Sequence, residues 1–285
     1  MAKLLLAKPL VEKTTENLKK RCEKLKEGGI TPCIKVILVG EDPASKVYTR
    51  SKKRLGEKIG ADAEIVNLPD DVSVEEFTTT IAKHNSDKNV HGLMVQLPVP
   101  SQLSGVDIQS LISPEKDVDG ATEHSLASII LGSKGENSLL PCTPSGIISL
   151  LKFYNIELVG KNVVIIGRSL IVGKPLAMLM TNYNATVTLC HSRTSNLMEH
   201  TQNADIIVTA IGQNSFLKAC HIKEGQTIID VGINRNSEGK LCGDVDFDAV
   251  EPIVSAITPV PGGVGPLTVL SLAQNLIETT EKNFS

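Results

Sequence analysis

The sequence contains no tryptophan, and aromatic residues make up only 3% of its 285 residues. No apolar run approaches the roughly 18 to 20 residues that cross a bilayer, since stretches such as 162–167 and 91–97 are far shorter. The 29 basic and 32 acidic residues nearly balance, which leaves no excess of positive charge for a phosphate backbone. The sequence therefore predicts neither a membrane protein nor a nucleic-acid-binding protein.

Disulfide and metal motifs are also missing. The six cysteines form no C-x-x-C motif, and the six histidines include no H-x-H or H-x-x-x-H pair, although small disulfide-stapled domains and zinc sites carry such spacings. We therefore expect reduced, mostly buried thiols and no metal. The few apolar residues before Lys8 are too short for the core of a signal peptide, so we expect an unprocessed, soluble, cytoplasmic protein.

With 41% apolar residues, the chain has enough material for one large or two medium domains. Strand-like apolar runs alternate with helical patterns almost from end to end, which is typical of β-α-β units around parallel sheets. The predicted fold class is therefore α/β. The polar segment 132–138 marks the expected boundary between a first domain over 1–140, with a C-terminal helix over 268–285 packed back on it, and a Rossmann-type domain over 141–267.

Individual elements follow from the periodicity. In the first domain we predict strands over 32–39, 64–68 and 90–97, helices over 11–27 and 44–59, and a helix introduced by an S-x-x-E capping box at Ser73 and Glu76. In the second we predict strands over 162–166, 186–190, 205–209 and 227–231, helices introduced by Thr143-Pro144 and ending near Tyr183, and a last helix over 269–277.

A glycine-bounded loop over 167–173 (GRSLIVG) follows the strand over 162–166 and leads into a helix. Such a loop presents backbone N–H groups and the positive helix end to a phosphate. It lacks the middle glycine of G-x-G-x-x-G, so taken alone it is equally consistent with a tight strand-to-helix turn.

The next strand ends in 190–194 (CHSRT), where an NAD-binding fold usually carries an acidic residue. No carboxylate here repels a phosphate, and Arg168 and Arg193 are available to donate to one. The stretch favours NADP over NAD as the cofactor, and it is also consistent with an ordinary polar strand end.

Three residues of the first domain are candidates for chemistry. Tyr48 and Lys52 are four residues apart on a predicted helix and share one face. A lysine beside a tyrosine serves in proton transfer if burial lowers its pKa, although spacing alone favours a boundary tyrosine and a solvated lysine. Gln96 ends an apolar strand, where open α/β sheets bind ligands, or it satisfies a loop backbone.

Two further segments carry candidate residues. Asp117 and Asp119 lie one residue apart in a turn, where they either bind a ring nitrogen or amino group or are simply solvated. The segment 259–266 packs three glycines and three prolines into eight residues. Positive-φ glycines, rigid turns and a cis proline in such a stretch bring backbone close to a flat ligand.

Taken together and in this order, these segments resemble the bifunctional methylenetetrahydrofolate dehydrogenase/methenyltetrahydrofolate cyclohydrolase family of the FolD type. The similarity covers essentially the whole chain. Each motif is weak alone, and the ordered set is specific. The motifs are Tyr48-x-x-x-Lys52, VQLPVP, PEKDVDG, PCTPSG, GRSLIVGKP, CHSRT, DVGIN and PGGVGPLT.

The resemblance implies two α/β domains flanking a cleft, in a homodimer built through the cofactor domain. It implies oxidation of 5,10-methylenetetrahydrofolate by NADP to the methenyl form, which is then hydrolysed to 10-formyltetrahydrofolate. Carried over by position, Lys52 is the catalytic lysine, Tyr48 the aromatic wall and Gln96 the residue that holds Lys52. The other implied contacts are Asp119, Gly262, Gly263 and Pro266 for the folate, and Gly167, Arg168, Ser169, Ser192 and Ile233 for NADP.

Three alternatives stay open at this point. A shikimate-dehydrogenase-like NADP oxidoreductase also joins an α/β substrate domain to a Rossmann domain, but it gives no role to PGGVGPLT. A member of the same family that has lost the cyclohydrolase step, or a non-catalytic NADP-binding module, would share the motifs. The segment 121–125 departs from the family pattern, so its contacts are not carried over.

Overall fold

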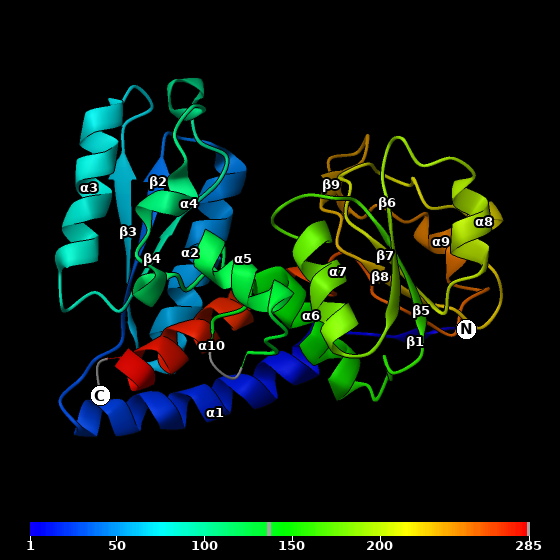
Figure 1. Ribbon diagram of the computed structural model, residues 1–285, viewed down its shortest axis with the longest axis horizontal. Coiled ribbons are helices and arrows are strands. Elements are labelled where there is room, and N and C mark those ends of the chain that lie inside the picture. Colours follow the sequence, from blue (N-terminus) through cyan, green and yellow to red (C-terminus); the bar gives the residue numbers. More distant parts are fainter. Residues whose placement is uncertain (136–137, 284–285) are drawn as a thin grey trace. The chain divides into compact units, whose positions relative to one another are not determined.

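The computed structural model describes residues 1–135 and 138–283, so the expected boundary at 132–138 lies partly outside the described residues. Its backbone divides into two compact units, both α/β with parallel sheets, which confirms the predicted fold class (Figure 1). Unit 1 comprises Met1–Val11, Ser128–Glu136 and Thr143–Thr268, and unit 2 comprises Glu12–Ala127, Asn137–Cys142 and Val269–Ser285.

Unit 2 is built on a three-stranded parallel sheet in the order β3-β2-β4. Helices α1 and α10 lie side by side in it (Figure 1), joined by an ion pair between Arg21 and Glu281. Its elements are α1 (Ala7–Glu27), β2 (Cys33–Val39), α2 (Pro43–Ile59), β3 (Asp62–Leu68), α3 (Val74–Ser86), β4 (Gly92–Val95), η1 (Ser101–Leu103), α4 (Ile108–Leu111), η2 (Pro114–Lys116), α5 (Glu123–Ile130) and α10 (Gly265–Asn283).

Local signals in the sequence explain the helices that follow β2 and β3. The Asp42 carboxylate accepts a hydrogen bond from the Ser45 N–H at 2.7 Å and caps α2, whose other end is closed by Gly60 at φ 90°. The Ser73 hydroxyl accepts from the Glu76 N–H at 3.1 Å and caps α3, as the S-x-x-E motif predicts. The core that these helices cover includes Ile37, Val39, Phe77, Ile81, Leu93, Val95 and Leu103.

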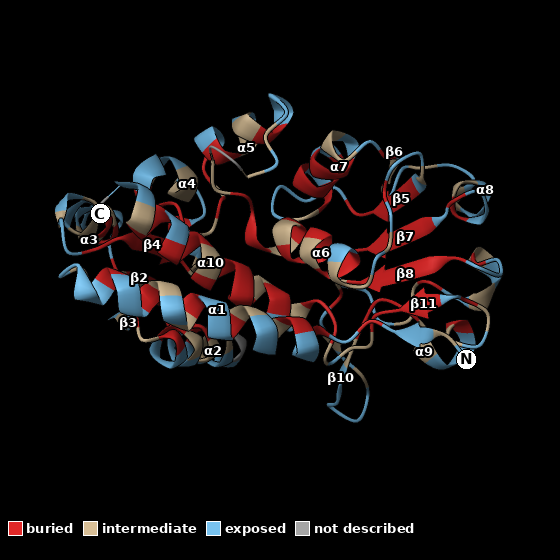
Figure 2. Ribbon diagram, turned by 90° about the horizontal axis from the view of Figure 1, so that it is seen from below, coloured by how far each residue is buried: buried red, intermediate tan, exposed pale blue. Residues whose placement is uncertain are grey.

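Unit 1 is built on a six-stranded parallel sheet in the order β1-β11-β8-β7-β5-β6. Its central strands β7 and β8 are fully buried (Figure 2). Its elements are β1 (Lys3–Leu4), α6 (Cys142–Phe153), β5 (Asn162–Ile166), α7 (Gly173–Asn182), β6 (Thr186–Cys190), α8 (Leu197–Gln202), β7 (Ile206–Thr209), η3 (Ala219–His221), β8 (Thr227–Asp230), β9 (Asn234–Arg235), β10 (Leu241–Cys242), α9 (Phe247–Val250) and β11 (Ala256–Ile257).

The strand order creates a switch point in unit 1. From β5 the chain passes to β6 on one side and then to β7 on the other, so the loops after β5 and β7 leave neighbouring strands in opposite directions. Open α/β sheets bind ligands in the crevice outside the carboxyl ends of the strands at such a point. The fold therefore presents the loop over 167–172 where a nucleotide-binding domain needs it.

A few sequence expectations differ from the structure. Helix α6 begins at Cys142, so Thr143 lies inside the first turn instead of capping it. Strand β4 ends at Val95, two residues before the predicted end. Gln96 N still donates to the Ile37 carbonyl oxygen on β2 at 2.9 Å, and the chain enters a loop at Leu97. Three of the six free cysteines, Cys22, Cys142 and Cys190, are buried, whereas Cys220 is exposed.

Within residues 1–135 and 138–283, no helix is both long and apolar enough to cross a bilayer. No group of three or more histidine, cysteine, aspartate or glutamate side chains is arranged to hold a metal ion in the same residues.

The closest approach of α2 to the sheet gives a test of packing in unit 2. A Cβ atom added at Gly56 would lie 2.8 Å from the Cβ of Ala63 on β3. We expect Gly56→Ala to destabilise the protein by about 1 to 3 kcal/mol through overpacking. This loss should appear even though alanine is about 1 kcal/mol more favourable than glycine in an exposed helix. Urea unfolding of the single variants and of Gly56→Ala/Ala63→Gly, in which the second change relieves the clash, measures this coupling. A Gly56→Ala protein as stable as the wild type contradicts it.

Candidate active site

The candidate site in unit 2 centres on the side chain of Lys52, which projects from α2 and is only 9% exposed. Its Nζ donates a hydrogen bond to Gln96 Oε1 at 2.8 Å and a second to Met94 Sδ at 3.4 Å. Both partners come from β4 or its carboxyl end, so the helix after β2 and the third strand of the sheet together hold the amine. The interpretation of Lys52 as a solvated lysine is therefore wrong.

The Gln96 amide has one orientation that satisfies both of its ends. Its Nε2 donates to the carbonyl oxygen of Leu97 at 2.7 Å, which turns Oε1 toward Lys52. The flipped amide would turn its oxygen toward the Leu97 carbonyl oxygen and lose that bond. Gln96 is the first residue beyond β4, and its amide oxygen holds the Lys52 amine. The hydrogen bond to the Leu97 carbonyl oxygen fixes the orientation of that amide.

The burial of Lys52 works against its charged form. Burial lowers the pKa of Lys52, and nearby Asp119 and Cys142 oppose this effect. Burial raises the pKa of Asp119, against the influence of Lys52, and it raises the pKa of the Cys142 thiol well above its usual range. The three groups form one buried cluster in which every ionised form is disfavoured by desolvation. A neutral amine at such a place can accept a proton.

Asp117 and Asp119 have different roles, although the sequence presents them as a pair. The Asp117 carboxylate is fully buried and accepts hydrogen bonds from the backbone of Ala121 and Thr122 and from the Ser125 hydroxyl. It is therefore a structural residue of this turn. A parallel bridge between Leu93 and Asp117 aligns the segment with β4, and this register carries Asp119 to the end of the strand, where it acts on Lys52.

Tyr48 lies one helical turn before Lys52 on α2 and is half-buried. Burial raises the pKa of its phenol, so the ring stays neutral and serves as an amphipathic surface. The two residues share the helix face that their spacing predicts.

Sequence reasoning missed two residues that hold the Asp119 segment. Asn275 on α10 donates from Nδ2 to the carbonyl oxygens of Val118 at 2.9 Å and Leu140 at 3.0 Å. The Cys142 thiol also donates to the Val118 carbonyl, at 3.3 Å. An asparagine within the apolar run of α10 could have indicated the role of Asn275. The PCTPSG motif could have indicated that of Cys142.

In unit 1 the loop after β5 is shaped for a close backbone approach. Gly167 has φ 124°, and a Cβ added there would lie 2.3 Å from the Ala210 carbonyl oxygen. A Cβ at Gly173 would lie 2.0 Å from the Gly167 carbonyl oxygen, so both ends of the loop require glycine. The Ser169 hydroxyl accepts from Val172 N and Gly173 N at 3.2 and 3.4 Å, which leaves its own hydrogen to donate to a ligand.

The remaining predicted cofactor residues are exposed at the carboxyl ends of the strands. Arg168 stands in the loop after β5, Ser192 follows β6, and Ile233 follows β8 with 46% of its surface exposed. The loop after β6 is held by the His191 N–H, which donates to the Thr194 hydroxyl at 2.8 Å. Hydroxyl and guanidinium groups without a carboxylate are what a 2′-phosphate requires.

The glycine-rich segment before α10 belongs to unit 1. Gly262 has φ 105°, and its carbonyl oxygen accepts from Ala7 N at 2.9 Å. A Cβ at Gly263 would lie 2.5 Å from the Pro259 carbonyl oxygen, and the Val260–Pro261 bond is cis. Lys52, Gln96, Tyr48 and Asp119 lie in unit 2, and Gly262, Gly263 and Pro266 lie in unit 1.

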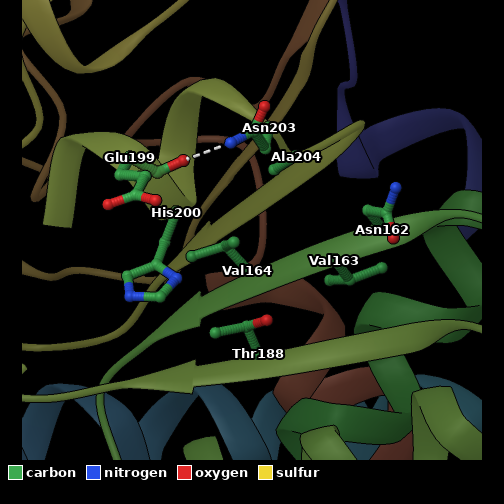
Figure 3. A pocket seen from close by; sticks show the side chains of 8 residues that line it. All are labelled: Asn162, Val163, Val164, Thr188, Glu199, His200, Asn203 and Ala204. Atoms are coloured by element: carbon green, nitrogen blue, oxygen red, sulfur yellow. Dashed lines mark hydrogen bonds between the residues drawn. The ribbon is translucent and has the colours of Figure 1, made fainter. Parts of the chain in front are cut away.

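A hollow beside α8 in unit 1 is separate from the predicted cofactor site (Figure 3). It begins at the amino end of β5, whereas nucleotides bind beyond the carboxyl ends of parallel strands. Its lining shares no residue with the predicted cofactor site. The lining residues are Asn162, Val163, Val164, Thr188, Glu199, His200, Asn203 and Ala204.

Comparison with known families agrees with this two-part arrangement. Residues 5–119 match the family model described as tetrahydrofolate dehydrogenase/cyclohydrolase, catalytic domain. Residues 141–284 match the model described as tetrahydrofolate dehydrogenase/cyclohydrolase, NAD(P)-binding domain.

Individual relatives are similar over the full length. The bifunctional protein FolD of Halalkalibacterium halodurans is 50% identical over 281 residues, which is 99% of each chain. The crystal structure of the bifunctional FolD enzyme from Campylobacter jejuni superposes with a TM-score of 0.96 at 42% identity and covers 100% of both chains. FolD of Trypanosoma brucei, solved with NADP and an inhibitor, gives a TM-score of 0.93 at 32% identity and covers 99% of this chain and 98% of its own.

The Lys52 environment predicts an unusual titration. Because burial lowers its pKa, Lys52 should lose its proton at a lower pH than the ordinary 10.5. Gln96→Glu places a carboxylate where the amide oxygen lies, 2.8 Å from Nζ, and should raise that pKa because an opposite charge favours the ammonium form. An NMR titration of ¹³C-labelled lysine ε-carbons measures both. Gln102→Glu, an exposed site, is the control, and a Lys52 signal unmoved by Gln96→Glu refutes the contact.

Proposed function

The chain belongs to the tetrahydrofolate dehydrogenase/cyclohydrolase family, and from this premise we propose that it oxidises 5,10-methylenetetrahydrofolate with NADP and hydrolyses the methenyl product to 10-formyltetrahydrofolate. The observation that carries the proposal is the buried Lys52 amine bonded to Gln96 Oε1 at 2.8 Å. This contact joins the residues that the family resemblance pairs for the chemical step. The reactions are one-carbon transfers that serve tetrahydrofolate interconversion and purine synthesis.

In the first reaction a hydride leaves the methylene carbon, and NADP, when bound, accepts it. The folate is left with a delocalised positive charge. A protonated lysine beside this carbon would repel that charge, and burial, which lowers the pKa of Lys52, favours the neutral amine there. Tyr48 contributes a half-buried aromatic wall, and Asp119 offers a carboxyl to the pterin ring. The dehydrogenase step thus needs positioning more than an acid or base.

In the second reaction water adds to the methenyl carbon. The neutral Lys52 amine accepts a proton from this water as the C–O bond forms, and Gln96 keeps the amine oriented. As the C–N5 bond breaks, the hydroxyl on that carbon releases its remaining proton and becomes the formyl carbonyl. N5 takes up one proton, Lys52 returns the other to solvent, and the formyl group stays on N10. One lysine can serve both steps because burial lowers its pKa. The neutral amine that this favours does not repel the folate cation, and it can accept a proton from water.

Several features support NADP as the cofactor and the loop after β5 as its phosphate site. Gly167 and Gly173 leave room for backbone to approach a phosphate, and the Ser169 hydroxyl has a hydrogen to donate. Arg168 and Ser192 are exposed without a neighbouring acidic strand end. We assign Ile233 to contact with the cofactor, and Gly262, Gly263 and Pro266 to the folate.

The alternatives make separate predictions. A dehydrogenase-only enzyme would need no base to activate water and no amide to orient such a base, and a binding module would need neither Tyr48 nor Asp119. The retained Lys52–Gln96 bond therefore favours the bifunctional enzyme.

The test follows NADPH and the methenyl species separately by absorbance, with NADP and then with NAD. We expect NADPH to form with little methenyl accumulation. Lys52→Met should lower the cyclohydrolase rate by about 10²- to 10⁴-fold, the size of a general-base contribution. Lys53→Met, which alters the exposed neighbour, is the matched control.

Each other result has a clear meaning. Stoichiometric accumulation of the methenyl form would leave a dehydrogenase alone. Full cyclohydrolase activity in Lys52→Met would refute the role of the lysine, and no reduction of either cofactor would refute the proposed reaction.

We further propose a homodimer formed through unit 1 and a cytoplasmic location. Strand β6 lies at one edge of the six-stranded sheet, and an uncovered edge strand is a site for pairing with a second copy. The six free cysteines suit a reducing compartment.

Sedimentation equilibrium should give twice the chain mass of 30.5 kDa. Thr188→Lys adds a charge on β6 and should shift the protein toward the monomer, whereas Glu224→Lys, on an exposed loop, should not. A monomeric wild type at micromolar concentration contradicts the proposal.

A further inference from the structure

Unit 1 contains two buried carboxylates that the proposed chemistry does not use. Asp230 ends β8 and is 4% exposed, and Asp244 lies between β10 and α9 and is fully buried. Neither forms an ion pair with another described residue. A buried carboxylate without a cation must be satisfied by hydrogen-bond donors, so the identity of those donors shows what each group holds.

The Asp244 carboxylate is satisfied mainly by one loop. Its Oδ2 accepts from the backbone N–H groups of Ile211 and Gly212 at 2.8 and 3.2 Å. Its Oδ1 accepts from the backbone N–H of Gln213 and from Asn234 Nδ2, at 2.8 and 2.9 Å. Three successive amides therefore converge on a single side chain, which fixes the conformation of the loop after β7.

Asp230 in turn holds the backbone around Asp244. Its Oδ1 accepts from Asp244 N at 2.9 Å and from Gly232 N at 2.9 Å, and its Oδ2 accepts from Val245 N at 3.0 Å. Burial raises the pKa of Asp230 to about 6, against these hydrogen bonds. The group is therefore ionised, and accepts hydrogen bonds, at neutral pH.

Two glycines make room for this arrangement. A Cβ atom added at Gly232 would lie 2.2 Å from Asp244 Oδ1, and one at Gly243 would lie 1.8 Å from Asp230 Oδ2. The segments D-V-G at 230–232 and G-D-V at 243–245 therefore pack against each other. The carboxylate of each aspartate occupies the space that a side chain would take at the glycine of the other segment. Any larger side chain at either glycine would displace a carboxylate.

The loop held by Asp244 lies beside the predicted phosphate loop. Strand β7 pairs with β5 at the switch point, and Ala210 N donates to the Ile166 carbonyl oxygen at 2.8 Å. The Ala210 carbonyl oxygen lies against Gly167, where a Cβ would approach it to 2.3 Å. Residues 211–213 thus continue directly from one side of the crevice, and Asn234 adjoins the proposed cofactor contact Ile233.

We propose that Asp244 is a positioning residue for the nicotinamide cofactor, which it serves by fixing 211–213 and Asn234 as walls of the crevice without touching the cofactor itself. The inference rests on the cofactor site proposed above. Asp230 supports this role by setting the backbone from which Asp244 projects.

The test compares Asp244→Asn with wild type. The amide keeps the size of the side chain but turns an NH₂ group toward backbone N–H donors. The dissociation constant for NADP should rise about 10- to 100-fold, a loss of one or two decades of affinity. Hydrogen exchange at 211–213 in the cofactor-free protein should speed up about tenfold or more. The cyclohydrolase rate, measured without NADP, should stay within about twofold, because Lys52 and Gln96 belong to unit 2 and share no partner with Asp244.

Two further variants complete the design. Asp248→Asn removes an exposed carboxylate from α9 and should leave all three measurements unchanged. Asn234→Ala removes one of the four donors to Asp244 and should weaken NADP binding by about threefold, the size of one neutral hydrogen bond, without changing exchange at 211–213. It provides the test should Asp244→Asn not fold.

The contrary outcomes are distinct. Wild-type affinity for NADP in Asp244→Asn or in Asn234→Ala would overturn the inference alone. A cyclohydrolase rate that falls in parallel with NADP affinity would also overturn it, because Asp244 would then support the whole chain. Failure of the wild type to bind NADP would overturn the proposed function together with the inference.

Discussion

The desolvation of Lys52 is the constraint on which the candidate site depends. A lysine that is only 9% exposed loses most of its hydration, so its amine must find acceptors inside the protein or give up its charge. Met94 on β4 and Gln96 just beyond it supply the acceptors, and nearby Asp119, whose own pKa is raised by burial, opposes the lowering of the lysine pKa. Removing the contact with Gln96 would therefore change both the geometry and the protonation of the lysine.

Unit 1 also buries polar side chains that must be satisfied inside the protein, but here they are carboxylates. Asp230 and Asp244 are buried without cations, and backbone amides satisfy them. Because these amides belong to the ends of neighbouring strands, satisfying the carboxylates also sets the loops around the switch point. A loop without the middle glycine of the usual dinucleotide motif can then still sit in a crevice of defined shape, with Gly167 and Gly173 providing the close approach.

Prediction from the sequence succeeded where a local signal decides the structure. The Ser73 cap acts within one turn of its helix, and the apolar run over 162–166 forms a strand with the predicted bounds. Prediction was wrong where long-range packing decides. Lys52 looks solvated by spacing alone, but its partners Met94 and Gln96 lie 42 and 44 positions away in the chain. The role of Asp117 was left open, and only the folded turn shows that its carboxylate accepts from Thr122 and Ser125.

By itself the sequence determined the α/β class, most strands and helices, and the ordered motifs that identify the family, because these depend on periodicity and on residues close together in the chain. Only the tertiary structure decided which polar residues share one environment. Lys52 and Gln96 are 44 positions apart, and Asp244 and Ile211 are 33 apart. Strand register and burial bring such pairs together, and burial sets their charge states.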